Sequence, residues 1–245
     1  MATLSVALIG NPNTGKSTIF NELTGIRQKI GNWPGVTVDK KVGYTKHKDR
    51  AISVMDLPGT YSINGRSSEE IIVENYLSGE KPDIIVDVID SSNIERNLFL
   101  CLQLLECRIP VLVDLNMMDE ANRKGIKIST AKLEKLLGMP VVETVGRSKK
   151  STNKLLDIFT STVMDSYKNS QQVEEHIANI EKLKATISDK EKLEEAIIEA
   201  RYAFIDKIVE QVVVKENVGN NLTEKIDKIL AYGFMALPIL VLMLY

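Results

Sequence analysis

A glycine-rich loop that ends in Lys-Ser constrains this chain more than any other feature. Residues 10–17 read GNPNTGKS and fit the pattern G-x-x-x-x-G-K-[ST] without a gap. An apolar run over residues 4–9 precedes the loop, and a predicted helix over residues 17–23 follows it. At such a helix start, backbone N–H groups bind phosphate oxygens. The sequence therefore predicts a phosphate-binding loop between a strand and a helix.

Glycine and proline divide the chain into two parts. Twelve of the 14 glycines and six of the seven prolines precede Arg147, and neither residue occurs between Arg147 and Val218. Before Arg147, short β-branched runs alternate with helical stretches, which indicates an α/β fold with a mostly parallel sheet of six or seven strands. The expected strands are residues 4–9, 38–44, 51–55, 84–89, 111–115 and 141–142.

The second part is predicted to be helical. Apolar residues recur there at spacings of three and four, with charged residues between them. Because no strict heptad persists, we expect several packed helices after a helix over residues 152–164, and not a coiled coil. The recurring apolar residues are Leu193, Ile197, Ala200, Phe204 and Ile208.

The last 17 residues, 229–245, are apolar and carry no charge. Their length is close to the lower limit of about 17 residues for a membrane-spanning helix. A buried C-terminal helix is the alternative, but every turn is apolar all round and Pro238 interrupts it. We therefore expect the start of a truncated membrane helix, and a cytoplasmic location for the rest because no secretory signal is recognisable.

Charge and potential metal ligands exclude several classes of function. A net charge of −2 gives no general attraction for phosphate backbones, so nucleic acid is not an expected partner. Cys101 and Cys107 lie in a predicted amphipathic helix, on different faces, and are expected to be reduced and unable to share a metal ion. His47 and His176 have no companions at metal-ligand spacing and are expected at the surface.

The residue types of the loop suit a nucleoside triphosphate. Lys16 places a positive charge between the β- and γ-phosphates, where negative charge accumulates during phosphoryl transfer. The hydroxyl of Ser17 is an oxygen ligand for Mg²⁺. The expected nucleotide-contacting residues of this loop are Gly10, Asn11, Pro12, Asn13, Thr14, Gly15, Lys16, Ser17 and Thr18.

Two further segments would complete the phosphate end of the site. Asp56 begins the sequence DLPG directly after an apolar strand, which places its carboxylate near the metal, and Gly59 brings an N–H close to the γ-phosphate. Thr37 lies in the Gly- and Pro-rich loop GNWPGVT and is expected to offer its hydroxyl to Mg²⁺. The expected nucleotide-contacting residues here are Gly35, Val36, Thr37, Asp56 and Gly59.

The sequence NMMD, residues 116–119, follows another predicted strand and indicates a guanine site. A fixed carboxylate at Asp119 accepts from both N1–H and the exocyclic amine of guanine, whereas adenine presents an acceptor at N1. Guanine is therefore selected because adenine would place an acceptor against the Asp119 carboxylate, which disfavours its binding. Asn116 and Met117 are expected to contribute to the same site.

In this order, the motifs resemble those of the cytosolic N-terminal region of the FeoB family of bacterial ferrous iron transporters. The resemblance covers nearly the whole chain, and the segment GNWPGVT would not occur in a generic GTPase. The most specific matches are residues 10–16, 31–37, 56–62 and 116–121. The resemblance implies a P-loop GTPase domain (1–166), a small all-α GDI-like helical domain that favours GDP binding (167–228) and the start of the first membrane helix (229–245).

The resemblance also implies roles and partners. Asn11 would help to bind a K⁺ ion that speeds hydrolysis, Thr37 would lie in switch I, and the residues after Gly59 would form switch II. The expected partners are guanine nucleotide, the membrane domain of the same full-length chain, small accessory proteins of the iron transport system and a second copy of the chain. The expected location is the cytoplasmic face of the inner membrane.

Some positions depart from the family pattern. Where the family has S-A-[KR] against the guanine, this chain has Val145, Gly146 and Arg147, so the N–H of Gly146 would act alone and weak base affinity is expected. Asp87 and Asp114 lie within apolar strands, where an unpaired carboxylate costs several kcal/mol or stays protonated. Edge exposure or a basic partner is the expected explanation for both.

The hydrolytic machinery is incomplete compared with many GTPases. Thr60 follows DLPG where many relatives have a glutamine that orients water, and Tyr61 does not easily replace it. Slow intrinsic hydrolysis is therefore expected, with the water held by backbone groups near residues 35–37 and Gly59. The expected catalytic residues are Lys16, Thr37 and Gly59; the expected metal ligands are Ser17, Thr37 and Asp56 for Mg²⁺ and Asn11 for K⁺.

Two other interpretations remain open from the sequence. The chain would be a soluble GTPase bound to ribosomal or transfer RNA if it had a basic surface, but residues 147–218 mix Glu and Lys about evenly. It would be a scaffold with a structural nucleotide if bound GTP were not hydrolysed.

Overall fold

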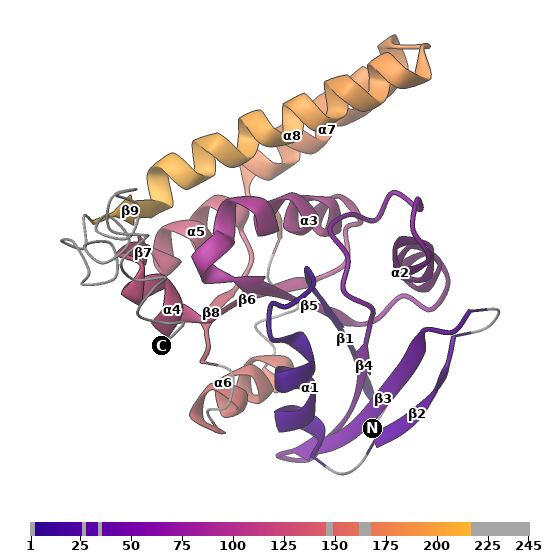
Figure 1. Cartoon of the computed structure of the whole chain (residues 1–245), viewed down its shortest axis with the longest axis vertical. Coiled ribbons are helices and arrows are strands. Elements are labelled where there is room, and N and C mark those ends of the chain that lie inside the picture. The colour runs from indigo at the N-terminus through magenta and orange to yellow at the C-terminus, as the bar shows by residue number, and fades with distance from the viewer. Residues whose placement is uncertain (1–2, 26–27, 34–35, 146–148, 162–167, 217–245) are drawn as a thin grey trace, which may run out of the picture.

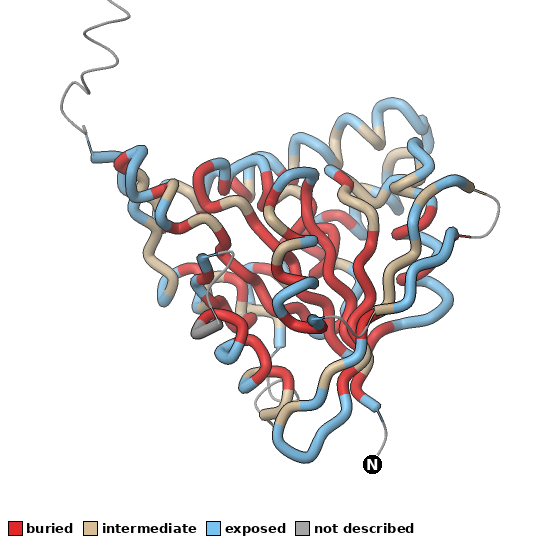
Figure 2. The backbone as a smooth tube through the Cα atoms, turned by 60° about the horizontal axis from the view of Figure 1, so that its bottom comes forward, coloured by how far each residue is buried: buried red, intermediate tan, exposed pale blue. Residues whose placement is uncertain are grey.

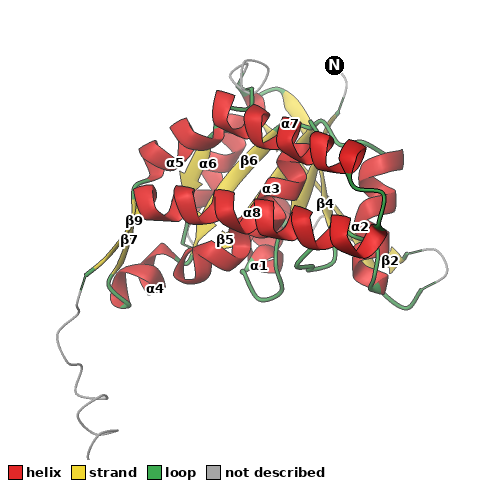
Figure 3. Ribbon diagram, turned by 90° about the horizontal axis from the view of Figure 1, so that it is seen from above, coloured by secondary structure: helices red, strands yellow, loops and turns green. Residues whose placement is uncertain are grey.

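The computed structural model describes residues 3–25, 28–33, 36–145, 149–161 and 168–216. A central sheet has helices on both faces, and a long helical hairpin lies outside one of these helical layers (Figure 1). Seen from above, the hairpin covers much of that layer (Figure 3). This architecture confirms the predicted α/β fold followed by a helical region.

Seven strands form the sheet, in the order β2-β3-β4-β1-β5-β6-β8. Neighbours from β4 to β8 run parallel, whereas β2 and β3 are antiparallel and form one edge. The sequence missed β2 because four of its five residues are exposed, which leaves no apolar pattern. The strands are β1 (Leu4–Ile9), β2 (Gln28–Asn32), β3 (Asp39–His47), β4 (Arg50–Asp56), β5 (Ile84–Asp90), β6 (Val111–Asn116) and β8 (Val141–Glu143).

Each face of the sheet has its own apolar core. Side chains from α1 and α6 cover one face, and those from α2, α3 and α5 cover the other. Figure 2 shows that the buried residues follow the strands, while the outer helices carry the exposed ones. The helices of these layers are α1 (Lys16–Thr24), α2 (Ser68–Gly79), α3 (Ile94–Glu106), α4 (Met118–Arg123), α5 (Thr130–Leu137) and α6 (Lys149–Thr160).

The hairpin consists of α7 (Gln171–Thr186) and α8 (Lys190–Val212). The side chains of Ser170 and Asp189 accept hydrogen bonds from backbone N–H groups in the first turns of these helices, so each helix begins with a capping residue. After α8, β9 (Val213–Lys215) pairs antiparallel with β7 (Ile126–Ile128). The sequence missed both strands, which are three residues long.

Three titratable residues that were expected at an edge or at the surface are buried. Asp87 and Asp114 are 1% and 0% exposed in the interior strands β5 and β6, so edge exposure is wrong for both. Within the described residues, no cationic side chain pairs with either, and burial raises the pKa of each to about 7. His176 is also buried, at 6% exposure, because α7 packs against α8 at this point.

The two cysteines differ in exposure: Cys101 is buried within α3, whereas Cys107, the residue that follows α3, is exposed. Across the described part of the chain, no helix is both long and apolar enough to cross a membrane. The predicted membrane segment, residues 229–245, lies outside the described residues, as does the end of the predicted helical domain at residue 228. The bounds of the three predicted domains therefore stay predictions.

Candidate nucleotide-binding site

The loop between β1 and α1 is held in one conformation by two glycines. Gly15 adopts a φ of 86°, and a Cβ at this position would lie 2.3 Å from Asn116 Nδ2. At Gly10, a Cβ would lie 2.4 Å from the carbonyl oxygen of Val88 on β5. Only glycine allows both approaches without strain. The loop therefore passes close to the carboxyl ends of the central strands.

A cavity of about 580 Å³ lies against this loop. Its volume is within the range of about 300–1,000 Å³ found for small-molecule sites. Most of its lining was expected from the sequence, and Glu69 in the first turn of α2 was not. The lining residues are Asn11, Pro12, Asn13, Gly15, Lys16, Ser17, Thr18, Gly59, Glu69 and Met117.

Lys16 and Ser17 line the cavity, and the side chain of Asp56 contacts both of them. Lys16 Nζ forms a buried ion pair with Asp56 Oδ1, and Ser17 Oγ donates to Asp56 Oδ2 over 3.3 Å. A hydroxyl and a carboxylate side by side are oxygen ligands of the kind that Mg²⁺ prefers. The residues present therefore fit a magnesium ion, and a bound phosphate would compete with Asp56 for Lys16.

Asn11 is the most unusual polar side chain of the loop. It is 3% exposed, and neither its Oδ1 nor its Nδ2 has a hydrogen-bond partner among the described residues. A buried amide without partners is destabilising by about 1–3 kcal/mol. Its carbonyl oxygen is therefore free to bind a cation, which fits the predicted role.

Asn116 joins the base-binding segment to the phosphate loop. Its Nδ2 donates to the carbonyl oxygen of Thr14 over 2.8 Å. Met117 has a φ of 59° and lines the cavity, and Asp119 is exposed in the first turn of α4. The structure thus holds NMMD beside the loop, with the Asp119 carboxylate accessible to a base.

The residues beyond β8 are only partly described. Val145 is 44% exposed, and its N–H donates to Ser151 Oγ over 3.3 Å. Gly146 and Arg147 lie outside the described residues. Their predicted contact with guanine stays a prediction.

The loop that contains Thr37 packs against α2 and the core. Thr37 is exposed and is not among the residues that line the cavity. Trp33 is buried with its ring edge-on to Tyr76 of α2, at 6.0 Å between ring centroids, and Val36 packs against the core. Gly35 lies outside the described residues. Contact of Thr37 with Mg²⁺ stays a prediction.

The segment after DLPG contacts the phosphate loop directly. Thr60 N–H donates to the carbonyl oxygen of Gly10 over 3.2 Å, and Gly59 lies against Pro12. The Thr60 hydroxyl donates to the carbonyl oxygen of Ser62 over 2.6 Å, within its own loop. The predicted absence of a water-orienting role for Thr60 stays a prediction.

Sequence reasoning missed Thr144, which connects the base-binding strand to its neighbour. Its hydroxyl lies 2.7 Å from Asp114 Oδ1 and 3.2 Å from Asn116 Oδ1. All three residues are at most 1% exposed. The available signal was the position of Thr144 directly after β8, where parallel strands end at the edge that carries the ligand.

Comparison with known proteins decides the family. The model of ferrous iron transport protein B matches residues 4–159, and the model of the FeoB cytosolic helical domain matches residues 154–214. The chain belongs to the FeoB family. Its fold is that of a P-loop GTPase domain followed by a helical region.

Individual relatives agree with this assignment. The chain is 38% identical over 238 residues to the Fe(2+) transporter FeoB of Helicobacter pylori, covering 95% of this chain and 35% of that protein. A Porphyromonas gingivalis Fe(2+) transport protein A/FeoB fusion is 46% identical over 159 residues, which is 64% of this chain and 19% of the fusion. This chain thus spans about a fifth to a third of these relatives.

A solved structure shows the same architecture. The cytosolic domain of the T. maritima FeoB iron transporter in its GMPPNP form matches with a TM-score of 0.75 and 29% identity, covering 86% of this chain and 100% of that chain.

Replacement of Gly15 by alanine tests the geometry of the loop. The Cβ would meet Asn116 Nδ2 and would hold an L residue in a left-handed conformation, which costs about 1–2 kcal/mol by itself. We expect GDP affinity, measured by isothermal titration calorimetry, to fall by about tenfold or more. The control is Gly79→Ala, where a Cβ meets nothing within 4 Å, and an equal effect of both changes would contradict the prediction.

Proposed function

We propose that this chain hydrolyses GTP to GDP and phosphate and regulates a ferrous iron transporter. The observation that carries the proposal is the cavity lined by Lys16 and Ser17 of the glycine-rich loop and by Met117 of NMMD, with Asp56 in contact with both loop residues. The match to a FeoB cytosolic domain in its GMPPNP form supports a site for a nucleoside triphosphate.

In the proposed mechanism the chain binds, orients and stabilises charge. The N–H groups from Asn13 to Ser17 and the ammonium of Lys16 bind the phosphates, and Ser17 and Asp56 would hold Mg²⁺. When bound, Mg²⁺ would neutralise charge on the phosphate oxygens. The N–H of Gly59 would bind the γ-phosphate, and loss of this phosphate would release the loop after it. We expect hydrolysis to be slow, because Thr60 stands where many GTPases have a glutamine that orients water.

The two segments proposed as switch I and switch II differ in their contacts with the phosphate loop. Thr37 is exposed and is not among the residues that line the cavity, whereas Gly59 and Thr60 already contact the phosphate loop. Loss of the γ-phosphate would therefore change the two segments to different extents. We propose that both changes reach the membrane domain of the full-length chain at the cytoplasmic face of the inner membrane, where accessory proteins or a second copy would also bind.

Nucleotide preference tests the proposed base contact. The protein is expected to hydrolyse GTP and not ATP, because only guanine offers two donors to the Asp119 carboxylate. Asp119→Asn is expected to reduce the preference for GTP over XTP by at least about tenfold, since an amide suits the xanthine carbonyl. Phosphate release would be measured for each nucleotide. Equal rates with GTP and ATP would contradict the proposal.

Asn11 provides the basis for a dependence on K⁺. We expect GTP hydrolysis to be faster in KCl than in NaCl at equal ionic strength, because the unpartnered Asn11 carbonyl oxygen would bind the larger cation beside the phosphates. Asn11→Ala is expected to remove the difference between the two salts while leaving GDP affinity within about threefold. A K⁺ effect that persists in this variant would contradict the role of Asn11.

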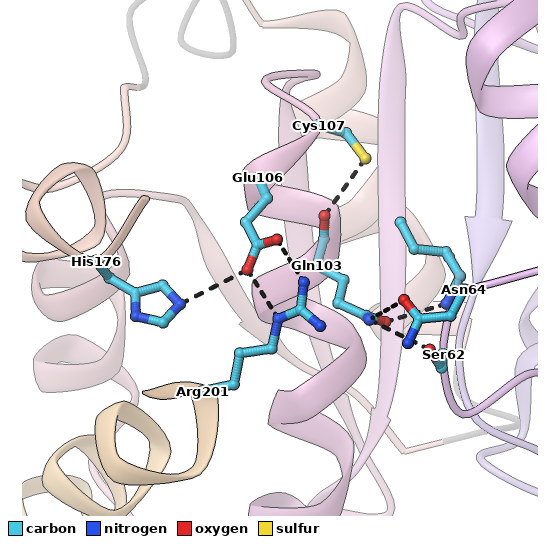
Figure 4. Close-up of polar contacts among 8 residues, drawn as sticks. Ser62, Asn64, Gln103, Glu106, Cys107, His176 and Arg201 are labelled. Atoms are coloured by element: carbon cyan, nitrogen blue, oxygen red, sulfur yellow. Dashed lines mark hydrogen bonds and ion pairs between the residues drawn. The ribbon is translucent and has the colours of Figure 1, made fainter. Parts of the chain in front are cut away.

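The segment after Gly59 is also anchored to α3. Gln103 accepts a hydrogen bond from Ile63 N–H over 3.0 Å and donates to Ser62 Oγ over 3.2 Å and to Asn64 Oδ1 over 3.0 Å (Figure 4). Gln103 is 1% exposed, so these bonds are shielded from water. One amide side chain thus fixes three successive residues of the proposed switch II.

One turn further along α3, Glu106 contacts the helical hairpin. Its carboxylate accepts from Arg201 Nε over 3.0 Å and from Arg201 Nη2 over 2.7 Å, and His176 Nε2 lies 3.6 Å from it (Figure 4). Burial by itself would raise the pKa of Glu106, but the hydrogen bonds and charges of His176 and Arg201 bring it below the ordinary value. We infer that α3 couples switch II to the hairpin.

Replacement of Glu106 by glutamine tests this coupling. Removal of the charge leaves Arg201 buried without its counter-ion, and breaking such a pair costs about 3–5 kcal/mol. We expect faster GDP dissociation, measured with a fluorescent GDP analogue, together with a lower free energy of unfolding in urea. The control is Glu210→Gln, an exposed residue of α8. An unchanged dissociation rate in a destabilised Glu106→Gln protein would show a purely structural role.

A further inference from the structure

β2 (Gln28–Asn32) forms one edge of the seven-stranded sheet, and β3 is the only strand that pairs with it among the described residues. Every second residue of an edge strand directs its N–H and C=O groups away from the sheet. In Figure 1, β2 lies at the opposite end of the sheet from β8, and no helix drawn there lies beyond it. A row of backbone donors and acceptors is therefore accessible along β2.

The two faces of β2 carry different side chains. Ile30 is 67% exposed, more than any other large apolar side chain of the described residues. It lies directly opposite Lys41 of β3, so these two side chains share one face. Lys29 and Gly31 lie on the other face, where Gly31 is opposite Lys40. One face thus presents an apolar side chain, and both faces have a lysine at the edge or beside it.

Positive charge is concentrated at this edge. Residues 28–50 contain six lysine and arginine residues and two aspartates, although the whole chain has a net charge of −2. Neither Lys29 nor Lys41 has an ion-pair partner among the described residues. Two copies of this edge would bring like charges together, which disfavours their pairing. An occupant of opposite charge is therefore favoured over a second copy of the chain.

An extended polypeptide segment fits the edge better than other acidic ligands. A strand that adds to a sheet edge forms main-chain hydrogen bonds, and its successive side chains lie on opposite faces. Side chains on one face of the added strand would contact Ile30, and those on the other would lie beside Lys29. A lipid headgroup carries negative charge but has no regular row of donors and acceptors to match a strand.

We propose that β2 is a docking edge for an extended segment of a partner protein in which apolar and acidic residues alternate. The segment adds to the sheet beside β2 through main-chain hydrogen bonds. Its apolar side chains cover Ile30, and its acidic side chains lie beside Lys29. Lys40 and Lys41, one strand further in, add to the attraction for the acidic residues.

The docking edge adjoins the segment proposed as switch I. Residues 33–38 connect β2 to β3 and contain Thr37, and Trp33 N–H donates to the carbonyl oxygen of Val38 over 2.9 Å. No residue of β2 is among those that line the nucleotide cavity. The partner segment would therefore bind next to this loop without occupying the cavity.

The probe is a fluorescently labelled peptide of sequence VEVEVE with blocked ends, and its binding is measured by fluorescence anisotropy. We expect saturable binding that weakens as NaCl is raised from about 50 mM to about 500 mM, because salt screens exposed charges. The peptide EEEVVV, which has the same composition without the alternation, is expected to bind at least about fivefold more weakly. Absence of VEVEVE binding, or equal binding of EEEVVV, would overturn the inference.

Main-chain pairing is tested separately from charge. A VEVEVE peptide in which every backbone nitrogen is methylated keeps its charges but has no N–H to donate, so we expect no binding. Hydrogen exchange of the β2 amides is expected to slow when the unmodified peptide binds, since bound amides are protected from water. Equal binding of the methylated peptide, or unchanged exchange in β2, would overturn strand addition.

Charge reversal at the edge tests the position of the site. Lys29→Glu combined with Lys41→Glu is expected to weaken peptide binding by at least about tenfold, and Ile30→Ser by about threefold or more. The matched control is Lys182→Glu combined with Lys184→Glu, which makes the same change of net charge at exposed positions of α7. It is expected to leave the affinity within about twofold. An equal loss in both double variants would overturn the inference.

A lipid surface is the competing occupant. Vesicles that contain phosphatidylglycerol present negative charge without a strand, and their binding is measured by co-sedimentation. If the vesicles bind through Lys29 and Lys41 while the peptide does not, the edge binds a membrane surface and the inference is overturned. Peptide binding that is lost in Lys29→Glu with Lys41→Glu, and kept in the α7 control, supports it.

Discussion

The hydrogen bond from Asn116 to the carbonyl oxygen of Thr14 joins the two halves of the nucleotide site. It forms because Gly15 has no side chain, since a Cβ there would lie 2.3 Å from the Asn116 amide. The phosphate loop and the base-binding segment come from β1 and β6, which are separated in the sheet by β5. One glycine thus allows a direct bond between segments that are about a hundred residues apart in sequence.

The buried charged residues of the G domain differ in their partners. Lys16 and Asp56 form a buried ion pair, while the partner of Asp114 among the described residues is the hydroxyl of Thr144. A phosphate can replace the carboxylate as the partner of the lysine, and Mg²⁺ can replace the lysine as the partner of the carboxylate. Burial of a carboxyl without a cationic partner instead raises its pKa. On the other face of the sheet, α3 carries Gln103 and Glu106 one turn apart, so a single helix contacts both the segment proposed as switch II and the hairpin.

The strands and the site motifs were largely predictable because their signals are local. Six strands were identified from apolar runs, and the loop, DLPG and NMMD motifs each lie directly after such a run. By contrast, β2 is exposed and β7 and β9 are three residues long, so pairing with a neighbour, and not composition, makes them strands. His176 has polar neighbours in sequence, and only packing of α7 on α8 buries it.

By itself, the sequence determined the fold class and predicted the phosphate loop and the choice of guanine, because each depends on residue types at fixed short spacings. Only the tertiary structure decided which groups meet across strands: Asn116 with Thr14, Thr144 with Asp114, and Glu106 with Arg201. It also showed that Thr37 is not among the residues lining the cavity and that Asp114 is buried with no cationic partner among the described residues. The physical reason is that contact and desolvation depend on neighbours that are distant in sequence, which no local pattern specifies.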